Sequence, residues 1–173
     1  MAKRLAAALL AALTALPAGA QETTAPATSG NEPNETSERY GAWTLHCTRT
    51  PEAGKACEVL HVVRGQQGPL AQVAFGRPDP SQPVLAVIRT PLGMNLQMPV
   101  SLTGEAIADT ALDWFICLQN GCLARAELDP AEVEALSAST ELQLAFQDGG
   151  ERPVEIALPV EGLADALSRL PSE

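Results

Sequence analysis

The pattern of apolar and polar residues from Trp43 onward predicts a mainly β domain. Apolar residues recur at every second position in short stretches, which is typical of strands with one buried face. Turn-forming residues such as Pro78 and Gly149 separate these stretches. Many short strands in succession predict an antiparallel β-sandwich or a barrel-like domain. The predicted strands cover residues 43–47, 57–64, 70–75, 84–90, 94–102, 112–117, 122–128, 142–146 and 154–158.

Two short helices are predicted near the C-terminus. Asp129 precedes Pro130, and Glu132 stands three positions after the aspartate, which together form a helix start with a capping box. This helix should end near Ser137. A second helix is predicted over residues 161–170, because its apolar residues follow the spacing of one buried helical face. These are Leu163, Ala166, Leu167 and Leu170.

The N-terminus has the three parts of a secretory signal peptide. Basic residues at positions 3 and 4 precede an apolar stretch over 5–18, and small residues follow, with cleavage predicted between Ala20 and Gln21. The apolar stretch is shorter than the about 20 residues that cross a bilayer. We therefore expect export to the periplasm or the medium and no transmembrane segment in the mature chain.

A spacer is predicted to follow the signal peptide. Residues 21–38 contain no aromatic and no large aliphatic residue, so they cannot bury enough apolar area to offset the entropy of ordering. The composition changes at Tyr40. The expected organisation is therefore a signal peptide over 1–20, a disordered spacer over 21–39 and a single domain over 40–173.

The net charge limits the range of partners. Without Lys3 and Arg4, 9 basic residues remain against 21 acidic ones, a formal charge of −12. Such a charge opposes binding to nucleic acid and to anionic lipid surfaces. It is compatible with a soluble protein or with a basic partner.

Four cysteines in an exported chain indicate disulfides. Three pairings are possible, and we favour the local one, Cys47 with Cys57 and Cys117 with Cys122. Zinc sites normally contain pairs of cysteines separated by two residues, and thioredoxin-like redox centres contain the same C-x-x-C spacing, which is not present here. Structural disulfides without a bound metal are therefore expected.

The second cysteine pair predicts a hairpin. The dipeptide Asn120-Gly121 alone would suggest a two-residue turn at these positions, but this register would separate the two sulfur atoms. A loop of four residues, 118–121, places Cys117 directly opposite Cys122, within disulfide range. We therefore expect the longer loop.

The sequence has no recognisable catalytic or cofactor motif. A G-x-S-x-G elbow, an H-E-x-x-H motif, a phosphate loop and a dinucleotide fingerprint are all absent. We therefore expect no catalytic residues, no cofactor and no metal. His46 and His61 could bind a soft metal such as copper together with Met94 and Met98, but only if their strands converge. We favour ordinary strand and core positions for all four.

Acidic and aromatic residues leave two further alternatives. Glu105, Asp109 and Asp113 flank a predicted strand and could form a catalytic pair, although solvated positions are the simpler interpretation. Trp43 and Trp114 each precede a cysteine by three or four positions. We expect their indoles to pack over a disulfide in the core rather than to form an exposed binding patch.

The order of several short motifs resembles a known family. Trp43-x3-Cys47, Cys57 and Pro91-Leu92-Gly93-Met94-x-Leu96 precede Phe115-x-Cys117-x3-Gly121-Cys122-x-Ala124, and Gly162-Leu163-x2-Ala166-Leu167 closes the chain. This arrangement, over residues 40–170, is similar to the invasion-associated locus B family of exported bacterial proteins. A departure is Leu163, where the family often has Phe.

The resemblance implies a small β-rich periplasmic or secreted domain without an established enzymatic mechanism. The family is named for an association with bacterial entry into host cells, although many members come from bacteria that invade nothing. We therefore expect a non-enzymatic accessory protein that presents one face to another cell-envelope or host protein. An undetected periplasmic enzyme, a carbohydrate-binding module and a subunit of a larger envelope complex are the alternatives.

Overall fold

A computed structural model describes residues 34–50, 54–66, 68–79 and 81–171, which all belong to one unit of the chain. The predicted signal peptide, its cleavage site and the spacer up to residue 33 lie outside the described residues. The strands are β1 Glu35–Tyr40, β2 Trp43–Thr50, β3 Gly54–Gly65, β4 Gly68–Arg77, β5 Val84–Thr90, β6 Val100–Gly104, β7 Thr110–Leu118, β8 Gly121–Leu128, β9 Leu142–Gln147 and β10 Pro153–Leu158. The helices are α1 Pro130–Ala138 and α2 Leu163–Leu167.

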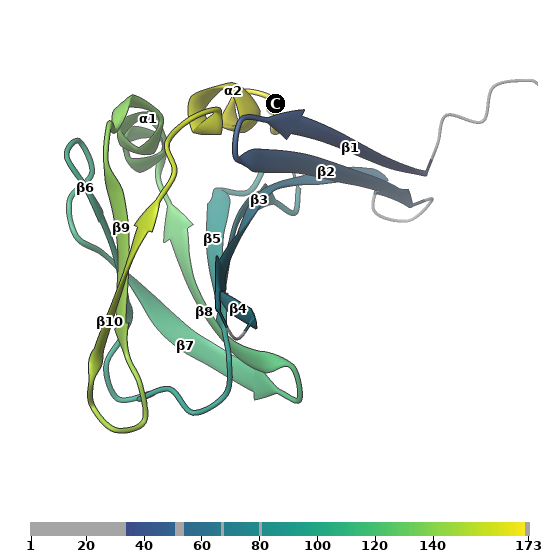
Figure 1. Cartoon of the computed structure of the whole chain (residues 1–173). Coiled ribbons are helices and arrows are strands. Elements are labelled where there is room, and N and C mark those ends of the chain that lie inside the picture. The colour runs from purple at the N-terminus through teal and green to yellow at the C-terminus, as the bar shows by residue number, and fades with distance from the viewer. Residues whose placement is uncertain (1–33, 51–53, 67, 80, 172–173) are drawn as a thin grey trace, which may run out of the picture. The chain divides into compact units, whose positions relative to one another are not determined.

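The strands form a curled antiparallel sheet (Figure 1). Their order is β1-β2-β3-β4-β5-β8-β7-β6-β9-β10. Of the two predicted forms, the structure is thus the barrel-like one, a half-barrel with two short helices. The mainly β, antiparallel prediction is confirmed.

Strand β7 connects the two parts of the sheet. Its first residues, Thr110 to Leu112, pair with β6, and its later residues pair with β8. The register shifts between Trp114 and Ile116, so Phe115 has no direct partner on β8. Such a bulge bends a strand and increases its twist. The bend lets one strand belong to both parts of the curled sheet.

The concave inner face of the sheet carries the core. Strand β5 illustrates the alternation, because Val84, Ala86 and Ile88 are buried, whereas Leu85 and Val87 are half-buried on the outer face. A strand with one fully packed face requires this period of two. Both helices lie together at one end of the sheet (Figure 1), where Leu136 of α1 and Leu163 of α2 are buried.

The predicted start of α1 is confirmed in detail. The Asp129 carboxylate accepts a hydrogen bond from the backbone N–H of Glu132, and the Glu132 carboxylate accepts one from the backbone N–H of Asp129, both at 2.8 Å. Helix α2 is shorter than the predicted 161–170. Its apolar face is nevertheless buried as expected, since Leu170 continues the face in the turn that follows.

Two parts of the strand prediction need correction. Residues 35–39, expected to belong to the spacer, form β1, which pairs along its length with β2. The strand has exposed side chains at all but its last residue, so no apolar pattern reveals it. The strand predicted over 94–102 forms only from Val100 onward, as the start of β6. Pro91, Gly93 and Pro99 favour turns in the preceding segment. Met94 makes only an isolated bridge to Asp148.

The first and last elements meet beside the helices. Trp43 at the start of β2 donates its indole N–H to the carbonyl oxygen of Pro159 at 2.8 Å. The backbone N–H of Ala42 donates to the carbonyl oxygen of Glu161 at 3.3 Å. The β1–β2 turn is thereby tied to the segment that leads from β10 into α2. Among the described residues, no helix has the length and apolar character to cross a bilayer.

Candidate binding surfaces

Both cysteine pairs lie at disulfide distance in the local arrangement. Cys47 and Cys57 face each other on β2 and β3, and Cys117 faces Cys122 on β7 and β8. The loop of the second hairpin is shorter than predicted, because Leu118 pairs with Gly121 and only two residues form the turn.

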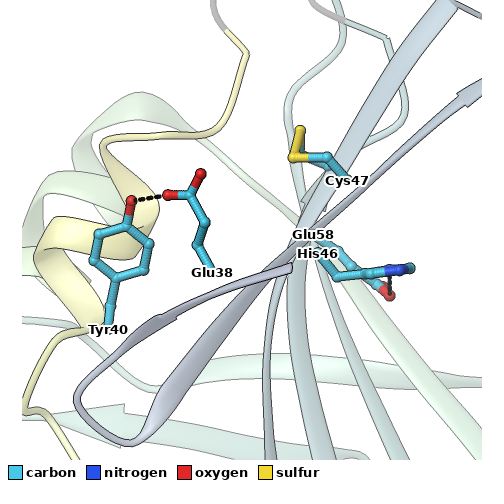
Figure 2. Close-up of a disulfide and its surroundings, with 6 residues drawn as sticks. Glu38, Tyr40, His46, Cys47 and Glu58 are labelled. Carbon is cyan, nitrogen blue, oxygen red and sulfur yellow. Dashed lines mark hydrogen bonds and ion pairs between the residues drawn. A yellow bond between two sulfur atoms is a disulfide. The ribbon is translucent and has the colours of Figure 1, made fainter. Parts of the chain in front are cut away.

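The two histidines lie on opposite faces of the sheet. His46 is on the outer face, where its Nε2 lies 2.8 Å from a Glu35 carboxylate oxygen and its Nδ1 lies 3.7 Å from one of Glu58. Figure 2 shows the side chains of His46 and Glu58 together, pointing away from the sulfur atoms of the Cys47 disulfide. His61 is on the inner face, where its Nδ1 lies 2.8 Å from the carbonyl oxygen of Ala42.

The copper-site alternative therefore has no geometric support. A two-stranded pairing of β2 with β3 puts His46 opposite Glu58, so His61 cannot join it on the same face. Across the described part of the chain, no group of three or more His, Cys, Asp or Glu side chains is arranged to hold a metal ion.

The two tryptophans differ in exposure. Trp43 is fully buried, with its ring centroid 5.4 Å from that of His61 and 5.7 Å from that of Phe75. The rings that contact its indole are therefore the aromatic side chains of His61 and Phe75. Trp114 is half-buried and donates its indole N–H to the carbonyl oxygen of Met98 at 2.7 Å. Both tryptophans thus hold segments of the domain together.

The three carboxylates considered as a catalytic pair have separate environments. Glu105 accepts a hydrogen bond from the hydroxyl of Thr140, and Asp109 accepts one from the hydroxyl of Ser101. Asp113 lies on β7, opposite Arg125 of β8. These contacts stabilise loops and a strand pair, which matches the simpler interpretation.

The outer face of the sheet contains a hollow of about 360 Å³, called here the outer-face hollow. Its centre follows from the strand register, in which Glu58, Gly76 and Leu85 are neighbours on three adjacent strands. Gly76 has no side chain, so the sheet surface is lowered between its neighbours. The lining residues are His46, Thr48, Ala56, Cys57, Glu58, Ala74, Gly76, Arg77, Pro78, Leu85 and Val87.

A second surface lies at the end of the sheet opposite the helices, and we call it the apolar end. It comprises the β3–β4 hairpin, the β5–β6 connection and the β7–β8 hairpin, which the register places side by side: Gln72 pairs with Arg89, and Thr90 pairs with Cys122. In the described part of the chain, every large hydrophobic side chain that is exposed belongs to it. These residues are Leu70, Leu92, Leu96, Met98, Phe115, Ile116 and Leu118.

The apolar end was missed because of its local pattern. Leu96 and Met98 alternate with polar residues and were predicted to be half-buried strand positions, but they are 50% and 49% exposed. A better signal was the distribution of charge. Residues 59–78, 80–104 and 114–126 contain no Asp or Glu, although the whole chain has 21.

These features define a class: small, mostly β proteins in which one curled sheet carries two short helices at one end and two cross-strand cysteine pairs. The sequence matches the family described as "Invasion associated locus B (IalB) protein" over residues 43–171. The chain therefore belongs to this family, and the resemblance inferred from its motifs is confirmed.

Similar proteins support the assignment. Invasion protein B homologs from Brucella abortus strain 2308 and from Brucella abortus biovar 1 strain 9-941 are each 28% identical over 141 residues, which cover 77% of this chain and 78% of theirs. The crystal structure of invasion associated protein B from Bartonella henselae superposes with a TM-score of 0.68 at 25% identity, covering 78% of this chain and 93% of that chain.

Proposed function

We propose that this protein is an exported, non-enzymatic accessory protein of the bacterial cell envelope that binds another protein through its outer-face hollow. The observation that carries the proposal is an apolar floor left open on the outer sheet face. Leu85 and Val87 are half-buried there, and Gly76 leaves space above the strands. A partner can gain apolar contact in such a hollow without any rearrangement of the sheet.

The charges around the hollow indicate the chemistry of the partner. The side chain of Glu58 is 45% exposed, and the neighbouring Glu35 is 70% exposed. Arg77, the cation of the lining, donates to the carbonyl oxygen of Pro171 at 3.1 Å. The hollow therefore suits an aliphatic side chain of a partner with a basic residue beside it.

The proposed export and the absence of catalysis have different supports. The signal-peptide pattern and the two cysteine pairs at disulfide distance support an oxidising compartment. The related proteins are named for invasion and not for a reaction. His46 and Glu58 are the polar groups that meet in the hollow, but their surroundings are open to solvent, whereas catalytic groups normally work in enclosed clefts.

Site-specific photo-crosslinking in the native envelope tests the proposal. A photoreactive residue at Val87 should give one discrete protein adduct, and the same residue at the exposed Glu134 of α1 should not. Gly76→Val should abolish the adduct by filling the hollow. Gly76→Ala should retain most of it, because the added methyl meets its nearest neighbours at 3.4 Å. Equal adducts at positions 87 and 134 would contradict the proposal.

A carbohydrate-binding role is the second candidate, because His46, Thr48 and Glu58 line the same hollow with polar atoms. N-acetylglucosamine oligomers should then shift the imidazole NMR signals of His46. The signals of His61, on the inner face, provide the internal control and should stay unchanged.

A further inference from the structure

The apolar end combines exposed hydrophobic side chains with a local excess of positive charge. Leu92 and Phe115 are 56% and 57% exposed, and the other five residues of the set lie between 43% and 50%. They extend from turns and strand ends of three chain segments that lie side by side. Burying one large apolar side chain is favourable, and seven at one end of a small domain require an explanation.

Two arginines lie near these side chains, and no described carboxylate pairs with either of them. Arg64 lies near the β3–β4 turn and Arg89 lies near the end of β5. Neither forms an ion pair with any described residue, and residues 59–78, 80–104 and 114–126 contain no Asp or Glu. The aliphatic part of Arg89 lies beside the β7–β8 hairpin, since a Cβ on Gly121 would lie 3.4 Å from Arg89 Cγ.

Other charged groups near this end are largely balanced. The β9–β10 turn reaches the same end through the hydrogen bond from the Gly149 N–H to the Gly93 carbonyl oxygen. It brings Asp148, which is paired with Arg152 at 2.6 Å, and the exposed Glu151. On β8, Arg125 lies over the Phe115 ring at 3.9 Å. Asp113 and Glu127 lie beside the same ring, so the positive excess is confined to the part of the apolar end that holds Arg64 and Arg89.

We propose that the apolar end docks on an anionic lipid surface, with its apolar side chains at the headgroup boundary and Arg64 and Arg89 beside the lipid phosphates. Exposed apolar residues flanked by basic ones are the usual composition of interfacial anchors. Arginine can keep its guanidinium in the polar layer while its aliphatic part stays with the apolar residues.

The distribution of the residues favours lipid over a protein partner. The side chains extend from turns and strand ends of three separate segments, with Phe115 beside a hollow that Asp113 and Arg125 also line, and a fluid interface adapts to such an uneven surface. A folded protein partner would need a surface complementary in shape to all three segments. The formal charge of −12 on the mature chain disfavours contact with anionic lipid, and this penalty is smallest where residues 59–78, 80–104 and 114–126 lack Asp and Glu. Docked in this way, the domain leaves its outer-face hollow, on the side of the sheet, open to a protein.

Vesicle flotation tests the proposal with the protein exported through its own N-terminal segment. Vesicles of 60% phosphatidylcholine and 40% phosphatidylglycerol are compared with pure phosphatidylcholine vesicles. We expect at least tenfold tighter binding to the anionic vesicles, weakened by 0.5 M NaCl. Leu92→Asp with Leu118→Asp and, separately, Arg89→Glu should each reduce binding by at least tenfold.

The controls separate this proposal from loss of fold and from the proposed function. Val87→Ser, a matched loss of an apolar side chain in the outer-face hollow, should leave vesicle binding unchanged, and Arg89→Gln should weaken it less than Arg89→Glu. All variants must keep the parent unfolding transition. Equal binding to both vesicle types, no binding to either, or equal effects of the position 87 and position 118 variants would overturn the proposal. So would a dimer in sedimentation that Leu118→Asp dissolves, because a second copy would then cover the surface.

Discussion

Gly162 lies against Tyr40 so closely that a Cβ on the glycine would be 2.1 Å from the Tyr40 carbonyl oxygen. Gly162 also has a φ of +82°, which disfavours other residues. Gly41 makes the reciprocal approach, since its Cβ would lie 2.5 Å from the carbonyl oxygen of Glu161. Two glycines therefore let the β1–β2 turn meet the start of α2.

Replacing Gly162 should be strongly destabilising. Gly162→Ala adds a methyl group where backbone atoms leave no room, and we expect a loss of about 2–4 kcal/mol in the free energy of unfolding, measured by urea denaturation. Gly93→Ala is the matched control. Gly93 has a similar φ of +88°, but a Cβ there meets nothing within 4 Å, so only the conformational cost of about 1–2 kcal/mol remains. Equal losses would show that the close approach does not matter.

The local cysteine pairing predicts the result of peptide mapping. Under non-reducing conditions, we expect Cys47 linked to Cys57 and Cys117 linked to Cys122 in the exported protein. A peptide that joins Cys47 to Cys117 would contradict the arrangement. Replacing both cysteines of either pair by serine should lower the free energy of unfolding by about 2–3 kcal/mol, because the unfolded chain loses a constraint.

The β9–β10 turn should be sensitive to acid. The hydrogen bond from the Arg152 guanidinium, together with the backbone N–H groups of Arg152 and Gly150, holds the pKa of Asp148 below its ordinary value of 3.8. Because the pKa is lowered on folding, the carboxylate stabilises the fold above the unfolded pKa, and this contribution is lost as the pH falls through the folded pKa. The window therefore lies at and below about pH 4.

An NMR titration of the Asp148 carboxyl carbon measures this effect. Arg152→Gln should move the Asp148 pKa up toward the ordinary value. An unchanged midpoint in that variant would show that the guanidinium is not the cause.

The predicted export can be measured at the N-terminus. Mass spectrometry of the exported protein should find Gln21 as its first residue. Ala20→Arg should block processing, since the cleavage site requires a small residue, and Ala27→Arg in the predicted spacer should not. If the Ala20→Arg protein is still processed to the same length as the parent, cleavage does not depend on a small residue at position 20, and the predicted site is wrong.

Tyr40 shows why β1 was not predictable. Its hydroxyl donates to the Glu38 carboxylate at 2.8 Å (Figure 2), and this bond raises the pKa of the phenol above 10.0. Both residues stand on an edge strand whose other side chains are exposed. Strand β1 is held in place by hydrogen bonds to β2 and by its contact with α2, and a local sequence pattern predicts neither.

The candidate surfaces were predictable only in part. Local chemistry identified the cysteine pairs, and the structure brings each pair together. The outer-face hollow depends on the alignment of Glu58, Gly76 and Leu85 across three strands, which a single strand does not reveal. The apolar end depends on where three distant turns meet, so Leu118 and Leu92 could not be assigned to one surface beforehand.

The sequence by itself determined the mainly β class, the capping of α1 by Asp129 and the family, because these follow from period, local hydrogen bonding and motif order. Only the tertiary structure decided that the sheet curls into a half-barrel, that His46 and His61 face opposite ways, and that the exposed hydrophobic residues gather opposite the helices. The physical reason is that local patterns set which side of a strand is apolar. Strand order and register, determined by contacts far apart in the chain, decide which of those sides become core and which remain open to a partner.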